Sequence, residues 1–407
     1  MSVYAEQTYD VIVVGGSFAG AAAAKRLVDA GLKTLVIEQM KLPRHKACSG
    51  IISPRGHRFL LENFGPLPPA ALHEPRTCKG VTFHYPDHLS MPMDFHYGPT
   101  PHLDRRYSDE WALRKSGAEI HDGTRLVSLE DSGSGVKIVA RRKEETISYQ
   151  ARYLIGADGP NSQVVKCLYP DHQKANPWFT VKQYFHKIKS CPLDRDYFHF
   201  WVNPDLGFYT WTHERAGEQI LGVGFEAGDD LEARHDRVLK YMREHHGLEL
   251  EPAGKQEGSV NNFGLSLINR YMFGRGNVLV TGQAAGFLNM IAEGMSCALH
   301  SGAIAGESVV DAIRFNRPVQ ETYRQMIGSE VQRCTDQWNP LKIFFGAPHE
   351  ADFMAAFKRH SVSERLRLLR DVWAFIKPWA RYGWGKQILW QAFVRKLSGG
   401  YSSSRWL

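Results

Sequence analysis

The chain has 407 residues and a formal net charge of +7, with 43% hydrophobic and 23% charged residues. This composition is ordinary for a globular protein and excludes an intrinsically disordered chain, and the length favours two interlocked domains over a single core. No apolar run reaches about 18 residues, which argues against a transmembrane helix. No N-terminal targeting segment is apparent, so we expect a cytoplasmic protein.

The cysteines are scattered along the chain and include no Cys-x-x-Cys pair: Cys48, Cys78, Cys167, Cys191, Cys297 and Cys334. This spacing argues against a zinc site and against a disulfide framework, and it fits a reducing compartment. We therefore expect no metal ion.

A short apolar run over residues 11–14 is stopped by Gly15 and Gly16 and leads into an alanine-rich segment. The pattern predicts a buried parallel strand and the following helix of a βαβ unit that binds a dinucleotide. Gly15 permits the tight turn, and Gly20 lets the helix pack close to the sheet, with its free N–H groups facing a pyrophosphate. Ser17 replaces the usual second glycine, and its hydroxyl can hydrogen-bond a phosphate.

Gly31 is placed to end this helix, and a second strand over residues 34–37 stops at Glu38. A carboxylate here can accept both ribose hydroxyls of an adenosine but would repel a 2′-phosphate, so FAD or NAD is favoured over NADP. A glycine-rich turn without a ligand is the weaker alternative, because strand, loop, helix, second strand and Glu38 occur in register.

Residues 82–145 alternate with a short period, which predicts antiparallel strands and one helix through Arg105 and Asp109. The chain then returns to the nucleotide domain with an apolar strand over residues 153–156. This strand places Asp158 at the carboxyl edge of the sheet, where ligands bind. An ordinary Asp-Gly turn is the alternative.

A third apolar strand, over residues 277–281, ends in a turn that contains Gly282, Gln283 and Gly286. Residues 292–296 then open a long helix, whose glycine and alanine spacing allows close packing. The N-terminus of this helix would aim backbone N–H groups at an electron-rich atom, which for a flavin means N1 and O2 of the reduced ring.

Residues 179–225 predict strands of an antiparallel substrate domain. The candidates to line a substrate cavity are Tyr197, His199, Trp201, Tyr209 and Trp211. An aromatic inner face suits an apolar or planar substrate, although core packing explains any one of these residues nearly as well. His199 and His213 are candidate proton donors.

The charge excess is confined to the C-terminal region. Residues 351–407 carry eleven lysines and arginines against three acidic residues, a net charge of +8, and five of the ten tryptophans. Helical stretches with aromatic and basic sides suit an anionic membrane surface. Such a contact would make the protein peripheral on the inner face of the membrane. A helical cap on the core explains the pattern equally well, and a gate over a hydrophobic tunnel is a further alternative. No recognised module accompanies the charge, so we expect no nucleic-acid partner.

The three glycine-rich segments, in this order and spacing, resemble the FAD-dependent para-hydroxybenzoate hydroxylase superfamily over residues 8–315. Residues 42–50 are similar to the cysteine loop of the geranylgeranyl reductase family within that superfamily. Arg105 matches that family's Arg-x-x-Phe-Asp helix, with Ser108 in place of phenylalanine. Residues 151–173 look like the CbrA-type bacterial members.

This resemblance implies an α/β (α+β) fold in which a Rossmann-like FAD-binding domain interlocks with an antiparallel-sheet substrate domain, followed by C-terminal helices. Residues 1–80, 101–175 and 266–330 would form the FAD-binding domain. Residues 81–100 and 176–265 would form the substrate domain, and residues 331–407 a basic, aromatic, helical C-terminal region.

The resemblance also implies FAD as cofactor, with NAD(P)H or another electron donor bound transiently. The residues implied to bind FAD are Gly15, Gly16, Ser17, Ala19, Gly20, Glu38, Gln39, Lys46, Ala47, Cys48, Arg105, Asp158, Gly282, Gln283, Gly286, Gly294 and Met295. Of these, Cys48, Gly294 and Met295 would lie at the flavin ring as catalytic residues. Gln283 departs from the family, which has aspartate there, and residues 289–294 are one residue shorter than the family's loop.

We expect a FAD-dependent oxidoreductase that reduces carbon–carbon double bonds of a prenyl or other lipid-like substrate by hydride transfer from the reduced flavin. The main alternative is a monooxygenase that uses NAD(P)H and O2 on an aromatic or hydrophobic substrate, because the superfamily's motifs fit both. A third hypothesis is a non-catalytic membrane-surface protein, which Gln283 and the basic C-terminal region motivate. No feature of the sequence predicts an oligomeric state.

Overall fold

The computed structural model describes residues 7–84, 90–171, 179–201, 206, 210–225, 230–261, 265, 270–289 and 292–345. The chain divides into two compact units, Met1–Cys334 and Thr335–Leu407. In the second unit only the later part of helix α9 (Gly328–Phe345) is described, so the account below concerns the first unit. Tyr209 and the C-terminal residues 351–407, with the helices predicted there, lie outside the described residues.

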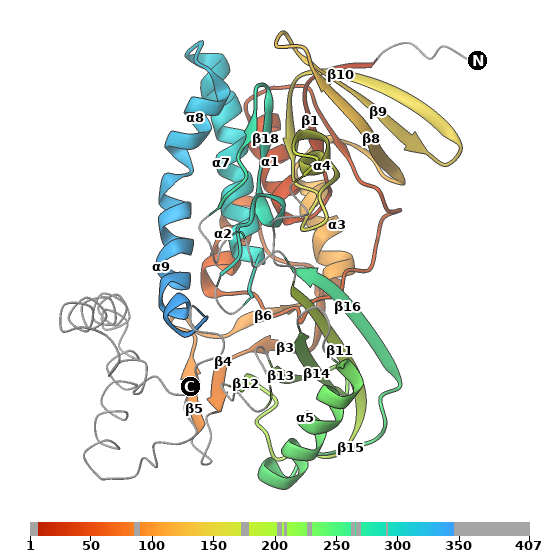
Figure 1. The fold of residues 1–407 in the computed structure, drawn as a ribbon, viewed down its shortest axis with the longest axis vertical. Helices are drawn as coiled ribbons and strands as arrows, with labels where there is room; N and C mark the ends of the chain where they lie inside the picture. Colours follow the sequence, from red (N-terminus) through yellow and green to blue (C-terminus); the bar gives the residue numbers. More distant parts are fainter. Residues whose placement is uncertain are drawn as a thin grey trace, which may run out of the picture. The chain divides into compact units, whose positions relative to one another are not determined.

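The first of two large sheets carries the predicted βαβ unit (Figure 1). Its main strand order is β17-β18-β10-β1-β2-β7, and β8 and β9 extend it from β10. The strands are β1 (Gln7–Val14), β2 (Thr34–Ile37), β7 (Glu119–His121), β8 (Thr124–Asp131), β9 (Val136–Arg142), β10 (Glu145–Gly156), β17 (Gly274–Arg275) and β18 (Val278–Val280). Because β2, β1, β10 and β18 run parallel, the three predicted glycine-rich turns meet at one edge.

Helices cover this sheet, and the predicted close packing of small residues is confirmed. The helices are α1 (Phe18–Asp29), α2 (Pro54–Phe64), α3 (Arg105–Lys115), α4 (Gln163–Leu168), α7 (Met295–Arg314) and α8 (Val319–Met326). A Cβ atom at Gly302 of α7 would lie 2.2 Å from the carbonyl oxygen of Ala19, and one at Gly306 would lie 2.6 Å from that of Ala23. Only glycine therefore allows α1 and α7 to approach this closely.

The second large sheet is built from β4 and β5 together with the strands between β11 and β16. Its order is β15-β11-β14-β13-β12-β4-β5, with β16 also paired to β11. The strands are β4 (Gly80–His84), β5 (Ser90–Asp94), β11 (Phe179–Ser190), β12 (Tyr197–Trp201), β13 (Thr210–Arg215), β14 (Glu218–Phe225), β15 (Glu249–Leu250) and β16 (Lys255–Asn261). All pairs are antiparallel except β4 with β12. Thus two separate stretches of chain form one sheet, as the interlocked fold requires.

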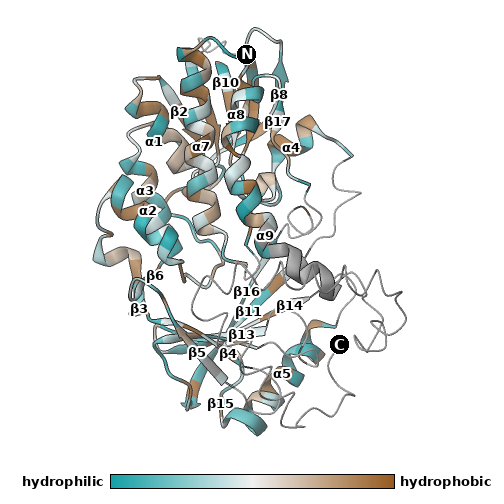
Figure 2. Cartoon of the chain, turned by 90° about the vertical axis from the view of Figure 1, so that its left-hand side faces the viewer, coloured by the Kyte–Doolittle hydropathy of each residue, from teal (hydrophilic) through white to brown (hydrophobic). Residues whose placement is uncertain are grey.

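The shorter elements of the first unit include η1 (Pro69–Ala71), η4 (Gly282–Ala285), and the antiparallel pair of β3 (Leu72–Cys78) and β6 (Thr100–Leu103). Figure 2 shows both hydrophilic and hydrophobic residues on α2, as expected of a helix with one buried side. Among the described residues, no helix is both long and apolar enough to cross a membrane.

Helix α5 (Leu231–His246) determines which face of the second sheet is core. Trp201 packs with Val238 and Met242 of α5 in a buried cluster. Since side chains alternate along a strand, Tyr197, His199 and Trp201 share this α5 face. The opposite face carries Phe198 and, through the register with β13, Trp211 and His213.

Candidate active site

Two adjoining cavities lie at the edge where the three glycine-rich turns meet. The smaller has a volume of about 280 Å³ and is bordered by predicted residues Gly15, Gly16, Glu38, Gln39 and Asp158. The larger, of about 430 Å³, is bordered by predicted residues Ala19, Ala47, Cys48, Arg105, Gln283, Gly294 and Met295. Ser17 and Lys46 border both cavities, so the structure brings most of the predicted cofactor residues to one continuous surface.

The loop between β1 and α1 is held against Glu38. The Gly16 N–H donates to Glu38 Oε2 at 2.9 Å, and the Met40 N–H donates to Oε1 at 3.0 Å. These two hydrogen bonds fix the carboxylate of Glu38, a residue that is only 5% exposed. A Cβ atom at Gly20 would lie 1.9 Å from the Gly15 carbonyl oxygen. Gly20 therefore acts by letting α1 begin directly beneath the loop, and it does not border either cavity.

Ser17 precedes α1, but its hydroxyl is directed toward α3. It donates to Asp109 Oδ2 at 3.0 Å and accepts from Arg105 Nη2 at 2.9 Å. The Ser17 side chain therefore makes no capping hydrogen bond at the start of α1. The first N–H groups of α1 and its positive dipole end are therefore available to an anion.

Cations outnumber carboxylates beside the start of α1. Asp109, which is fully buried, accepts from Arg105 Nε at 2.8 Å and from Arg44 Nη1 at 3.0 Å, and Arg44 Nε also lies 3.4 Å from Glu38 Oε2. Although burial opposes ionisation, Arg105 and Arg44 hold the pKa of Asp109 well below its usual range. Burial, reinforced by Arg105, lowers the pKa of Lys46 to about 8. Three cations facing two carboxylates leave a surplus positive charge, which fits a pyrophosphate.

The Asp158 carboxylate is engaged within its own turn. It accepts from the Ser162 hydroxyl at 2.6 Å and from the Gln163 N–H at 2.6 Å, so it holds the start of α4. Burial raises the pKa of Asp158. We infer that Asp158 shapes the cavity wall and that its carboxylate is not free to bind a ligand.

The turn after β18 contributes one side chain to the larger cavity. Gln283 Nε2 donates to Asn261 Oδ1 at 2.8 Å and so links η4 to β16. Gly282 and Gly286, both with positive φ, border neither cavity. A Cβ atom at Gly286 would lie 2.5 Å from Leu265 Cβ. These two glycines therefore permit the turn and its packing, while Gln283 takes the place of the family's aspartate at the cavity.

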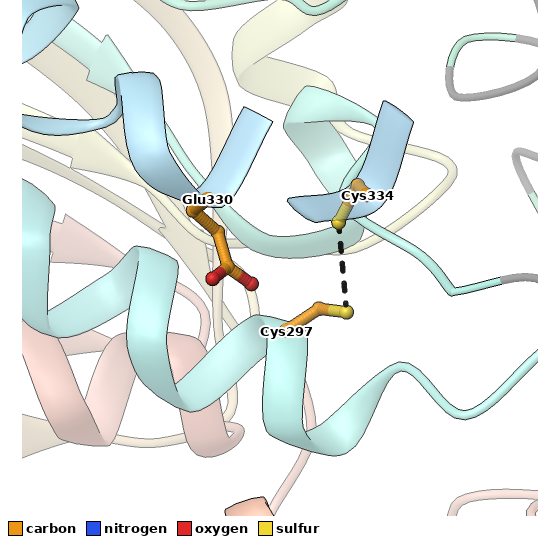
Figure 3. Close-up of side chains that lie close together, drawn as sticks. All are labelled: Cys297, Glu330 and Cys334. Carbon is orange, nitrogen blue, oxygen red and sulfur yellow. Dashed lines mark hydrogen bonds between the residues drawn. The ribbon is translucent and has the colours of Figure 1, made fainter. Parts of the chain in front are cut away.

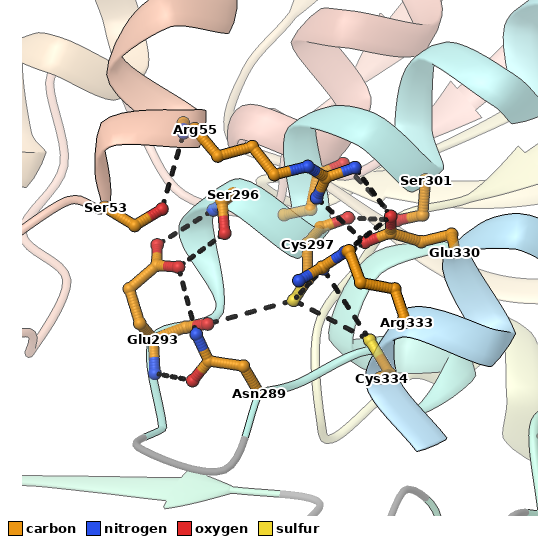
Figure 4. A network of polar contacts seen from close by, with 12 residues as sticks. Ser53, Arg55, Asn289, Glu293, Ser296, Cys297, Ser301, Glu330, Arg333 and Cys334 are labelled. Atoms are coloured by element: carbon orange, nitrogen blue, oxygen red, sulfur yellow. Dashed lines mark hydrogen bonds and ion pairs between the residues drawn. The ribbon is translucent and has the colours of Figure 1, made fainter. Parts of the chain in front are cut away.

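The start of α7 borders the larger cavity, with Gly294 as its N-cap followed by Met295. The loop before it is fixed by its own residues (Figure 4). The Ser296 N–H donates to Glu293 Oε1 at 2.8 Å, and the Glu293 N–H donates to Asn289 Oδ1 at 2.7 Å. The helix N-terminus predicted to face a cofactor thus borders the larger cavity, and these hydrogen bonds support it.

The Cys48 loop is held from the second sheet. Arg215 of β13 donates from Nη1 to the Cys48 carbonyl oxygen at 2.8 Å. Glu257 of β16 lies 4.0 Å from Arg215 Nη2 and 3.2 Å from Nε2 of His45, which belongs to the same loop. Neither Arg215 nor Glu257 lies in a recognisable motif, so sequence reasoning missed both.

Three of the predicted substrate residues lie away from the larger cavity. Tyr197, His199 and Trp201 lie on the α5 face and do not border the cavity, whereas Phe198 does. Both faces of β12 carry aromatic residues, so the alternation indicated a strand but could not indicate its buried face. The remaining described candidate, Trp211, shares the Phe198 face without bordering the cavity.

Trp211 and His213 form a second layer behind Phe198. The Trp211 ring covers Gly222, where a Cβ atom would lie 1.9 Å from it. The His213 ring centroid lies 5.4 Å from that of Phe198, and burial lowers the pKa of His213 well below its usual value. Proton donation by His213 stays a prediction. Besides Phe198, the apolar wall includes residues that no motif indicated: Ile51, Val81, Phe95, Val260 and Leu288.

Comparison with known proteins places this geometry in context. A family model described as FAD binding domain matches residues 8–288. A protein named CbrA from Escherichia coli O157:H7 is 29% identical over 307 residues, which cover 73% of this chain and 82% of that protein. A geranylgeranyl diphosphate reductase from Rhodobacter capsulatus is 29% identical over 324 residues, which cover 76% of this chain and 77% of that protein.

Solved structures share the fold at low identity. A geranylgeranyl bacteriochlorophyll reductase-like protein from Thermoplasma acidophilum has a TM-score of 0.69 and 19% identity, covering 83% of this chain and 88% of that chain. A myxobacterial chondrochloren halogenase has a TM-score of 0.70 and 17% identity, covering 97% and 90%. A p-nitrophenol 4-monooxygenase from Pseudomonas putida has a TM-score of 0.62 and 13% identity, covering 91% and 94%. These likenesses show the common architecture alone.

Proposed function

Since the chain belongs to the FAD binding domain family, we propose that this flavoenzyme uses FAD to reduce carbon–carbon double bonds of a prenyl or other lipid-like substrate. When bound and reduced, FAD supplies the hydride, and the protein supplies binding, orientation and exclusion of water.

The two cavities divide the cofactor between them. Glu38 in the smaller cavity would accept the adenosine ribose hydroxyls, because its carboxylate is fixed at the end of β2. The diphosphate would lie at the start of α1, where Arg44, Lys46 and Arg105 leave a surplus of positive charge. The flavin end would then occupy part of the larger cavity, between Gln283, the start of α7 and the Cys48 loop.

The observation that carries the proposed reaction is the pairing of Cys48 with an apolar wall in the larger cavity. Phe198, Val81 and Phe95 face this cavity and would accept an uncharged chain while excluding water. Cys48 brings a thiol to the same space, and we propose that this thiol donates the proton that completes the reduction. The relative named geranylgeranyl diphosphate reductase supports a prenyl substrate.

Monooxygenation is the second candidate function, with NAD(P)H as transient electron donor. The fold shared with p-nitrophenol 4-monooxygenase supports this candidate, because one fold can serve different reactions. Under this alternative, Cys48 has only a packing role.

Product mass distinguishes the two functions. FAD-loaded protein would be incubated with a bacterial isoprenoid and lipid extract, once under nitrogen with chemically reduced flavin and once in air with NAD(P)H. We expect products that gain hydrogen pairs and no oxygen, and a Cys48→Ala variant that forms them more slowly. Products that gain one oxygen atom, and only in air, would overturn the proposal in favour of monooxygenation.

The partner that we propose for residues 351–407 is an anionic membrane surface, because their net charge of +8 accompanies five tryptophans. Truncation after Val362 should reduce sedimentation with anionic liposomes. Unchanged sedimentation would contradict the proposed membrane contact of residues 351–407.

A further inference from the structure

Two buried thiols lie face to face behind the start of α7. Cys297 is in the first turn of α7 and Cys334 is in α9, and their Sγ atoms are 3.9 Å apart (Figure 3). Both residues are 0% exposed. Together with Glu330 they are the one group of three potential metal ligands that the described part of the chain brings together.

The arginines around Glu330 argue against a metal ion. Arg55 donates to Oε1 at 3.2 Å and to Oε2 at 2.7 Å, and Arg333 donates to Oε2 at 3.1 Å and to Oε1 at 2.5 Å (Figure 4). A carboxylate offers about four acceptor positions, so these bonds occupy them all. A metal would have to displace a guanidinium that already neutralises the charge.

Of these two arginines, Arg333 also lies beside the Cys297 thiol. Arg333 Nη2 lies 3.3 Å from Cys297 Sγ and 3.8 Å from Cys334 Sγ. Cys297 is also the third residue of α7, in the first turn, where the helix dipole favours an anion. The hydrogen bond from Cys334 lowers the pKa of Cys297 despite burial, and Arg333 lowers it further. Cys334, in turn, keeps its proton, because that hydrogen bond and burial raise its pKa.

We propose that Cys297 and Cys334 are a redox pair that hydrogen peroxide converts into a disulfide. The Cys297 thiolate attacks the peroxide, so that an S–O bond forms, the O–O bond breaks, and hydroxide leaves and takes up a proton. The Cys334 sulfur then attacks Cys297 Sγ. The S–S bond forms, the S–O bond breaks, and the hydroxyl leaves as water with the Cys334 proton. Both thiols are oxidised, and the peroxide is reduced to two molecules of water.

The two sulfur atoms already lie close together. For a disulfide to form, the distance between the two Sγ atoms must fall from 3.9 Å to about 2.05 Å. The disulfide would join the first turn of α7, whose neighbours Gly294 and Met295 border the larger cavity, to α9. Burial restricts the reaction to oxidants small enough to enter a transient opening.

The test uses the full-length, FAD-loaded protein. It would be treated with hydrogen peroxide, alkylated, digested without reduction and examined by mass spectrometry. We expect a peptide cross-linked through Cys297 and Cys334 that dithiothreitol separates, and its absence from the Cys297→Ser and Cys334→Ser variants. Free Cys297 and Cys334 alongside oxidised Cys167, which is partly exposed and has no thiol neighbour in the described structure, would overturn the proposal.

Arg333 provides a second, kinetic test. Arg333→Met should slow cross-link formation roughly tenfold, because the Cys297 thiolate loses its cation. Arg317→Met is the matched control, since Arg317 is exposed and should leave the rate unchanged. Equal rates in the Arg333 variant and the wild type would contradict the role of the thiolate. If elemental analysis found one equivalent of zinc in the purified protein, the redox proposal would be overturned in favour of a metal site.

Discussion

Arg215 of β13 donates a hydrogen bond of 2.8 Å to the carbonyl oxygen of Cys48, 167 residues earlier in the chain. Arg215 is 8% exposed, and Glu257 lies 4.0 Å from it. The bond fixes the loop that borders the larger cavity against the sheet that supplies its apolar wall. Because the donor is a buried charged group, removing this hydrogen bond costs more free energy than removing an exposed contact.

Arg215→Met is therefore expected to lower turnover about tenfold, while FAD stays bound. The methionine keeps part of the apolar stem but cannot hold the Cys48 carbonyl. Turnover and FAD occupancy would be measured on the same preparation. Arg195→Met is the control, because Arg195 is exposed and pairs with Glu214 on the same sheet. Equal losses in both variants would mean that the Cys48 loop does not depend on Arg215.

Glu38→Ala should weaken FAD binding by about tenfold to a hundredfold. The substitution removes the proposed acceptor of the ribose hydroxyls and leaves the Gly16 N–H without the partner it has now. Fluorescence titration of the apoprotein with FAD measures the effect. Asp29→Ala serves as a control, because Asp29 is exposed and pairs only with Lys25 in the described structure. An unchanged Kd would remove Glu38 from the ribose site.

Lys46 should make FAD binding dependent on pH. Burial and Arg105 lower its pKa to about 8 in the empty protein, and a bound diphosphate favours the charged amine. Binding therefore takes up a proton above pH 8, so the Kd should be constant below that pH and should rise up to about tenfold per unit above it. Lys46→Met should bind FAD more weakly with no such rise. A wild-type Kd that stays flat to pH 9 contradicts this role.

Cys48→Ala should leave FAD occupancy unchanged and reduce turnover of the prenyl substrate, because the thiol is the proposed proton donor. Cys48→Ser separates chemistry from size, since serine has similar volume but a far less acidic hydroxyl. Cys191→Ala is the control, because Cys191 is a partly buried residue packed against the second sheet's core cluster and does not border either cavity. Wild-type turnover in both Cys48 variants would return Cys48 to a packing role.

Buried histidines on the α5 face should destabilise the protein in acid. His84 Nε2 lies 2.9 Å from His199 Nδ1, and burial, with His199, lowers the pKa of His84 from 6.5 to about 3. The unfolded chain gains this proton near pH 6.5 and the folded protein only near pH 3, so stability falls as pH falls between these values. The loss is about 1.4 kcal/mol per pH unit.

Urea unfolding from pH 7 to pH 4 measures this loss. His84→Asn should have a shallower pH dependence than the wild type, whereas His96→Asn, at an exposed position, should match the wild type. A midpoint that does not change over this range would show that the buried pair does not control acid stability.

The parts of the fold and the site that sequence could predict are local. Short apolar strands that end at a glycine-rich turn predicted β1, the end of β10 and β18, and the apolar strand that ends at Glu38 predicted β2, since each strand and its turn lie within a few residues. Glu38 followed from its place at the end of β2. Phe198 could not be distinguished from Tyr197 and His199, because the face of β12 is decided by α5, more than thirty residues away. Arg215 and Glu257 reach the Cys48 loop only through tertiary packing, and no local pattern encodes that.

The most direct test of the proposed reduction follows the flavin itself. FAD-loaded protein is reduced under nitrogen and mixed with a prenyl substrate, and the absorbance band of oxidised flavin is recorded without oxygen. We predict that the band returns at the rate at which saturated product forms, and more slowly in the Cys48→Ala variant. A flavin that stays reduced with substrate, and reoxidises only when oxygen is admitted, would contradict the account.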